Sequence, residues 1–89
     1  MHQMEECRAY VLIKVKSGKE LEVFEKIRGL QHKYPLTEVA IVYGDYDIVT
    51  RVRIPRPQEL EDFVLTELRR IEGISETKTL ITARFAEFK

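Results

Sequence analysis

The order in which the hydrophobic periodicity changes along the chain constrains the fold of this protein most strongly. Residues 9–16 alternate apolar side chains between two faces, as a β-strand does, and so do residues 76–85. Residues 37–54 hold two further apolar runs on either side of a Gly-Asp turn, which predicts a β-hairpin. Residues 17–30 and 57–71 repeat apolar side chains at the spacing of an amphipathic helix. The predicted order, β-α-β-β-α-β, is the ferredoxin-like arrangement of an α+β domain.

Both predicted helices carry recognisable start signals and an apolar stripe. Ser17 and Glu20 have the spacing of a capping box, so the first helix is expected to begin at Ser17. Its buried stripe is predicted to consist of Leu21, Phe24, Ile27 and Leu30. Pro57 is well placed as the first residue of the second helix. The second stripe is predicted to consist of Leu60, Phe63, Val64, Leu68 and Ile71.

The handedness of the two crossovers predicts which face of the sheet is covered. Each β-α-β crossover is right-handed, so both helices are expected on the same face of a four-stranded antiparallel sheet. The strands also offer apolar side chains to the other face. A contiguous apolar face left in water usually marks an interface, and two-fold pairing is the commonest solution. The chain is therefore predicted to dimerise through its open sheet face.

Length, charge and cysteine content narrow the class of protein. The chain has 89 residues, so residues 1–89 are expected to form a single domain. Fifteen basic residues balance fifteen acidic ones, whereas a dedicated nucleic-acid binder usually has a basic excess. No apolar stretch approaches the roughly 18–20 residues of a membrane span, and no signal peptide is recognisable. The single cysteine, Cys7, fits a reducing compartment. These features predict a cytoplasmic protein with no membrane or direct nucleic-acid partner.

The sequence contains no convincing catalytic or metal-binding cluster. His2 and His32 lie far apart in the sequence, each in a polar setting, and no histidine lies near Cys7 to activate it. The four glycines are scattered and form no phosphate-binding loop. We therefore expect no catalytic residue, no metal site and no cofactor.

The turn of the predicted hairpin concentrates acidic and aromatic residues. Gly44 and Asp45 are residues that any tight turn favours, so an ordinary turn is the simpler interpretation. A tyrosine and a second aspartate, Tyr46 and Asp47, are less expected directly after them. Asp47 stands at the start of a strand, where aspartate is disfavoured. A carboxylate here could contact a cation, and free backbone N–H groups near Gly44 could contact an anion. A free α-amino acid carries both charges, so the turn is a candidate ligand site.

A second candidate lies in the last predicted strand. Thr77 and Thr79 are two residues apart, which places both hydroxyl groups on one face of the strand. Each hydroxyl can donate and accept a hydrogen bond, which suits a polar ligand. Threonine is also a common strand residue, so this signal is weak by itself.

Three motifs of the chain resemble those of the effector domain of the Lrp/AsnC transcription regulators. Residues 42–48 resemble the G-x-Y-D hairpin of that family, and residues 60–64 resemble its L-x-x-F-[VI] helix. Residues 71–79 resemble its I-x-G-[VI]-x-x-T-x-T stretch. The motifs occur in the right order and spacing, and the resemblance covers about residues 9–85. In that family this part is the effector-binding half, often called the RAM domain.

The resemblance implies a regulatory domain and not an enzyme. It implies the ferredoxin-like fold, pairing of two copies through their sheets, and further assembly of dimers into rings. It also implies that a small amino acid binds between neighbouring dimers. The positions that match the family's ligand-contacting turn and strand are Gly44, Asp45, Tyr46, Asp47, Thr77 and Thr79.

Full-length members of that family begin with a helix-turn-helix DNA reader. In this chain the first strand begins near residue 9, so it is interpreted as a stand-alone effector domain. The expected role is to sense an amino acid and to co-assemble with full-length relatives, without direct DNA binding.

Two other functions are compatible with the same fold. Monooxygenase-type ferredoxin-like dimers need a polar or haem-binding cavity lined by His, Asn or Trp, and this chain has no Trp and no Asn. An ACT-like regulatory domain also binds amino acids, but in the loop after the first strand, here residues 16–19. The G-x-Y-D and T-x-T motifs favour the Lrp/AsnC interpretation over both.

Overall fold

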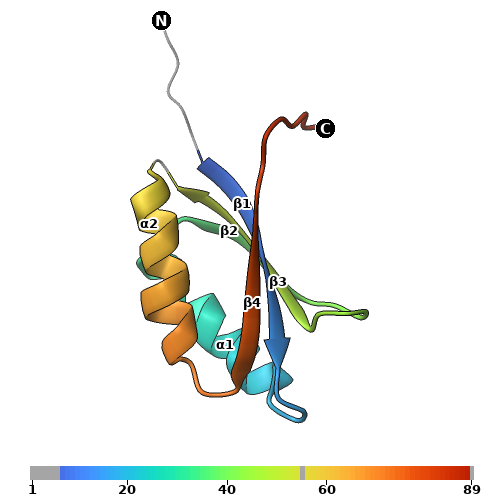
Figure 1. Cartoon of the computed structure of the whole chain (residues 1–89). Helices are drawn as coiled ribbons and strands as arrows, with labels where there is room; N and C mark the ends of the chain where they lie inside the picture. Colours follow the sequence, from blue (N-terminus) through green and yellow to red (C-terminus); the bar gives the residue numbers. More distant parts are fainter. Residues whose placement is uncertain (1–6, 55, 89) are drawn as a thin grey trace, which may run out of the picture.

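The computed structural model describes residues 7–54 and 56–88, and this part of the chain folds in the predicted order (Figure 1). The strands are β1 (Cys7–Val15), β2 (Leu36–Ile41), β3 (Ile48–Ile54) and β4 (Ile74–Ile81). Helix α1 (Glu20–Gly29) is extended by a 3₁₀ turn (Leu30–His32). Helix α2 (Pro57–Asp62) continues through a π turn (Phe63–Glu67) and a 3₁₀ turn (Leu68–Arg70).

The four strands form one antiparallel sheet in the order β2-β3-β1-β4. Strands β1 and β3 occupy the centre, and β2 and β4 form the edges. Both helices lie on the same face of this sheet (Figure 1). The ferredoxin-like fold and the placement of both helices on one face are therefore confirmed.

The core lies between the two central strands and the two helices. Alternate residues of β1 and β3 enter it, and the helices contribute the facing side chains. The buried apolar residues of the strands and of the two helical regions are Ala9, Val11, Ile13, Val15, Val23, Ile27, Ile48, Val52, Leu60, Phe63, Val64 and Leu68. Thr50 is buried among them, and its hydroxyl donates a hydrogen bond to the Glu38 carbonyl (2.9 Å), which satisfies the buried polar group.

The second helical stripe is as predicted, but the start of α1 is not. Helix α1 begins at Glu20 after Lys19, and Ser17 makes no capping hydrogen bond. Leu21 is 70% exposed, whereas Val23 and Ile27 are buried. Val23 lies about 200° around the helix from Leu21, so packing Val23 against the sheet turns Leu21 toward solvent. The predicted capping box and the predicted burial of Leu21 are therefore wrong.

Two strand ends also differ from the sequence-based bounds. Strand β2 ends at Ile41, so a six-residue loop, residues 42–47, replaces the tight turn that was predicted. Strand β4 ends at Ile81 rather than near residue 85. The Thr82 N–H still donates to the Arg8 carbonyl (2.8 Å). Residues 83–88 then form a C-terminal tail, with no further strand partner among the described residues.

Candidate functional site

Asp47 fastens the loop of residues 42–47 to the end of β1. Its N–H donates to the Ile13 carbonyl (2.9 Å), and its Oδ2 accepts a hydrogen bond from the Val15 N–H (2.8 Å). The last β1–β3 pair is Ile13 with Ile48, so Val15 has no partner residue on β3. The carboxylate takes the place of that missing partner. This explains why an aspartate, which strands disfavour, stands directly before β3.

The remainder of this loop is open to solvent. Gly44 has a φ of +131° and Asp45 is exposed. The ring of Tyr46 is half-buried, and the Lys14 Nζ lies 5.6 Å from its centroid. The backbone N–H groups of residues 44–46 donate to no acceptor within the described chain. The loop therefore presents backbone donors beside the free Asp45 carboxylate.

Tyr43 is part of this surface and was not predicted as a site residue. Its side chain is fully exposed, at the start of the same loop. A tyrosine is rarely left entirely in water, because most of its surface is apolar. In the sequence, the position of Tyr43 directly before Gly44 indicates that it belongs to the turn. The alternating apolar run of residues 39–43 instead predicted that Tyr43 is a strand residue.

The two threonines share one face of β4 but line different hollows. Thr77 pairs with Ile13 and Thr79 pairs with Val11, and both partners are buried, so both hydroxyls lie on the helix-covered face. Thr79 lines a groove of about 460 Å³ between β4 and α2, whose other walls include Leu60, Val64, Leu65 and Ile81. Thr77 lines a hollow of about 350 Å³ with Arg69, Ile74, Ser75 and Glu76.

The loop and the two threonines do not form one site within a protomer. Ile13 of β1 pairs with Ile48 on one side and with Thr77 on the other, so β1 lies between the two sets. Two strand spacings separate them, about 10 Å. No hydrogen bond joins them in the part of the chain that the structure describes. Within one protomer, the loop and the two threonines are therefore two separate sets of polar groups.

Neither a metal cluster nor a membrane span is found in the described chain. No group of three or more His, Cys, Asp and Glu residues lies close enough to hold a metal ion, as far as residues 7–54 and 56–88 are concerned. No helix in these ranges is long and apolar enough to cross a membrane.

A known protein family matches most of the chain. The family model of the Lrp/AsnC ligand binding domain matches residues 8–85. The HTH-type transcriptional regulator FL11 of Pyrococcus furiosus is 42% identical over 77 residues, which cover 85% of this chain and 48% of FL11. The chain spans about half the length of the curated relatives it matches.

Solved structures of two kinds share the fold. TTHA0845 from Thermus thermophilus has a TM-score of 0.82 and 32% sequence identity, and the match covers 92% of this chain and 99% of that one. The structure of E. coli AsnC has a TM-score of 0.83 and 21% identity, and the match covers 93% of this chain but 54% of AsnC. The fold thus occurs both in a chain of similar extent and as part of a longer chain.

Proposed function

Because this chain belongs to the Lrp/AsnC ligand binding domain family, we propose that it is an amino-acid-sensing domain that assembles into oligomers. The ligand is a small free amino acid, bound between dimers. The observation that carries this proposal is the loop of residues 42–47, which combines unpaired backbone donors, an exposed carboxylate and a rigid attachment to β1. Its task is regulatory, and it requires no catalytic residue.

The chemistry of the loop matches the two charges of an α-amino acid. The unpaired N–H groups of Gly44, Asp45 and Tyr46 can donate to the ligand carboxylate. The Asp45 carboxylate can accept from the ligand ammonium group. Asp47 positions the loop through Oδ2, while its Oδ1 accepts no hydrogen bond from the described residues and is available to the same ammonium group.

A neighbouring copy completes the proposed site. Thr77 and Thr79 are separated from the loop of their own protomer by β1, and we propose that their hydroxyls contact a ligand held by the loop of another copy. The fully exposed Tyr43 would pack against that copy and exclude water from the ligand. Such an arrangement couples ligand binding to the association of dimers.

Dimers are proposed to form through the open face of the sheet. Tyr10 and Leu80 are paired neighbours on this face and remain 41% and 49% exposed. Leu12 and Val49 form the adjoining pair and are half-buried. Covering these side chains with a second copy removes apolar surface from water, which favours two-fold association.

Full-length relatives are the proposed macromolecular partners. FL11 is about twice the length of the matched region and is a transcriptional regulator, whereas the matched part corresponds to this chain. We propose that this chain joins such regulators in mixed assemblies and changes their state when the amino acid binds. In this proposed role the protein acts in the cytoplasm together with those regulators.

Thermal unfolding in the presence of each of the twenty amino acids tests the sensing role. A ligand at 100 times its dissociation constant adds about 2.7 kcal/mol to the unfolding free energy, which gives a clear increase in the midpoint. One or a few amino acids are expected to raise it. If none does, the chain is not an amino-acid sensor.

Two substitutions separate binding from folding. Asp45→Ala is expected to weaken binding of the active amino acid and to change the unfolding free energy by less than about 0.5 kcal/mol, because the side chain is exposed. Asp47→Ala leaves the Val15 N–H without its partner and is expected to cost about 1–3 kcal/mol. Calorimetric titration and urea unfolding measure the two effects. Glu25→Ala, on the outer face of α1, is the control and should leave binding unchanged.

A further inference from the structure

The C-terminal tail lies on the open face of the sheet, where two copies are proposed to pair. Arg8, Arg51 and Arg53 project from this face, because the residues that alternate with them on β1 and β3 are buried under the helices. The three arginines and the tail residues Phe85 to Phe88 line a hollow of about 750 Å³, which we call the arginine hollow. The tail, dark red in Figure 1, therefore covers one end of the face opposite the helices.

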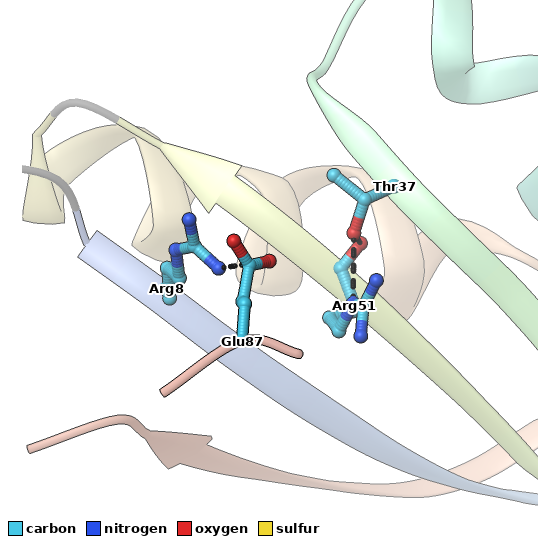
Figure 2. Close-up of polar contacts among 4 residues, drawn as sticks. All are labelled: Arg8, Thr37, Arg51 and Glu87. Atoms are coloured by element: carbon cyan, nitrogen blue, oxygen red, sulfur yellow. Dashed lines mark hydrogen bonds and ion pairs between the residues drawn. The ribbon is translucent and has the colours of Figure 1, made fainter. Parts of the chain in front are cut away.

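Arg8 holds the tail in this position. Its Nη1 donates a hydrogen bond to Glu87 Oε2 (2.9 Å; Figure 2), and its guanidinium lies 3.8 Å from the centre of the Phe85 ring. The Thr82 N–H, directly before the tail, donates to the Arg8 carbonyl (2.8 Å). The hydrogen bond from Arg8 also lowers the pKa of Glu87, which favours its charged form. The tail is thus fastened near both of its ends to one residue of β1.

The tail makes few contacts with the sheet beneath it. The Glu87 side chain is 65% exposed, and Phe85 and Phe88 are 53% and 92% exposed. The arginine hollow lies between the tail and the strands. Exposed ion pairs and exposed cation–π contacts are individually weak. The tail can therefore leave the sheet without disturbing the core.

A tail in this position and a second copy on the same face exclude each other. Two sheets that pack face to face lie about 10 Å apart, and their own side chains fill the space between them. A further segment of chain does not fit into that space. Tyr10 lines the arginine hollow and also forms the exposed pair with Leu80 on the proposed dimer surface. The tail therefore reaches the surface that a second copy would cover.

We propose that the C-terminal tail is an autoinhibitory strap, which Glu87 and Phe85 hold against Arg8 and which blocks one end of the pairing face. The inference rests on the proposed sheet dimer and adds that the tails of both copies must open before the sheets can pair. A two-fold dimer uses the same face of both copies, so opening of the tail enters the dissociation constant twice. A weak contact in each protomer thereby becomes a stronger control of assembly.

The dimer dissociation constant of full-length variants tests the proposal. Glu87→Gln is expected to tighten pairing between about threefold and tenfold, because an exposed ion pair is lost from each of the two tails. Phe85→Ser is expected to tighten it by a similar factor, because the stacking on Arg8 is lost. Sedimentation equilibrium at constant ionic strength measures both. Unchanged or weaker pairing of either variant would overturn the proposal.

Phe88→Ser is the matched control within the tail. Phe88 is almost fully exposed, and its ring makes no contact with another ring or a cation in the described part of the chain. This variant should leave the dissociation constant unchanged. If Phe88→Ser instead weakens pairing, the tail contributes contacts to the dimer, and a blocking role is wrong.

A double-mutant cycle assigns the effect to the contact between Arg8 and Glu87. In an Arg8→Gln background, Glu87→Gln is expected to change the dissociation constant much less than it does in the native chain, because its partner is already absent. Any other interaction of Arg8 is missing from both chains of that comparison and cancels. An equal gain with and without Arg8 would show that Glu87 does not act through this contact.

The same measurements distinguish failure of this proposal from failure of the proposed function. If Leu80→Lys separates the dimer and Glu87→Gln leaves pairing unchanged, the sheet dimer stands and the tail does not block it. If neither the native chain nor Glu87→Gln forms a dimer, the sheet pairing is wrong as well. The response of Glu87→Gln to amino acids in thermal unfolding should match that of the native chain. The loop of residues 42–47 is attached at Ile13, about 17 Å along β1 from Arg8.

Discussion

Gly73 holds the turn before β4 against the start of α1. Its φ is +108°, and its carbonyl accepts a hydrogen bond from the Lys16 N–H (2.7 Å). A Cβ atom at this position would lie 2.9 Å from Val23 Cγ2 and 3.2 Å from Lys19 Cβ. The backbone conformation and the close approach of α1 both require glycine here.

Gly73→Ala and Gly29→Ala are therefore expected to have opposite effects. The first adds backbone strain and a steric clash and should lower the unfolding free energy by more than about 1 kcal/mol. Gly29 has helical dihedral angles and open space around it, so alanine there should add up to about 1 kcal/mol. Urea unfolding of the two variants measures both. If Gly73→Ala left the unfolding free energy unchanged, α1 would have to move away from residue 73 without loss of stability.

The sequence did not show which of the two aspartates, Asp45 or Asp47, is available to a ligand. Both were candidates for ligand contact, and the motif gave no reason to separate them. The structure shows that Asp47 has a partner in its own chain, the Val15 N–H, whereas Asp45 is exposed. That partner lies 32 positions away, so no local pattern could reveal it.

At the scale of elements, Tyr34 joins the segment after α1 to α2. Its ring is buried and lies 5.0 Å from that of Phe63. Its hydroxyl donates to Asp62 Oδ2 (2.8 Å). This hydrogen bond lowers the pKa of Asp62 below its ordinary value of 3.8, and burial together with Asp62 raises the pKa of Tyr34. The contact therefore favours the charged carboxylate and the neutral phenol.

Tyr34→Phe is expected to remove part of the acid sensitivity of the fold. The pKa of Asp62 is lower in the folded chain than in the unfolded chain, so the charged carboxylate stabilises the fold above pH 3.8. This stabilisation is lost as the pH falls through the pKa of the folded state. The stability difference between native chain and variant should thus be largest near neutral pH and shrink below pH 3.8. Urea unfolding across this range measures it.

Tyr43→Phe is the control for this prediction, because Tyr43 is fully exposed and its hydroxyl has no partner in the described chain. It should leave the dependence of stability on pH unchanged. An equal stability difference for Tyr34→Phe at every pH would show that the hydroxyl does not act through Asp62.

The two helices differ in how well the sequence predicted them. The stripe of the second helix was correct because Leu60, Phe63, Val64 and Leu68 agree with a single helical face. In α1, Leu21 and Val23 are both apolar but lie on different sides, and only packing against the sheet decides between them. The turn before α1 contains Gly18 with a φ of +88°, which moves the helix start past Ser17.

At the scale of the whole molecule, the open sheet face combines two surfaces. Leu12, Val49 and Leu80 form an apolar centre with Tyr10, as the sequence predicted. The arginine hollow at one end was not predicted, because Arg8, Arg51, Arg53 and Glu87 meet only through strand pairing and the return of the tail.

Leu80→Lys is expected to separate the proposed dimer into folded monomers. A lysine in a paired apolar face must lose hydration without gaining a partner, which opposes association. Leu80 is already half exposed in the protomer, so the monomer fold should be nearly unaffected. Sedimentation velocity measures the mass, and Leu21→Lys on α1 is the matched control. A native chain that is monomeric at micromolar concentration would contradict this pairing.

The sequence by itself determined the order of the elements, the ferredoxin-like fold and the hairpin that carries the candidate site, because these depend on local periodicity and turn residues. The tertiary structure decided which side chains are available. In the structure, Asp47 is hydrogen-bonded to β1, whereas Asp45 and Tyr43 are exposed to solvent. Strand β1 lies between the loop and Thr77. Three arginines lie around Glu87. Strand pairing and packing join residues distant in the chain, and this is the physical reason that local sequence could not reveal these contacts.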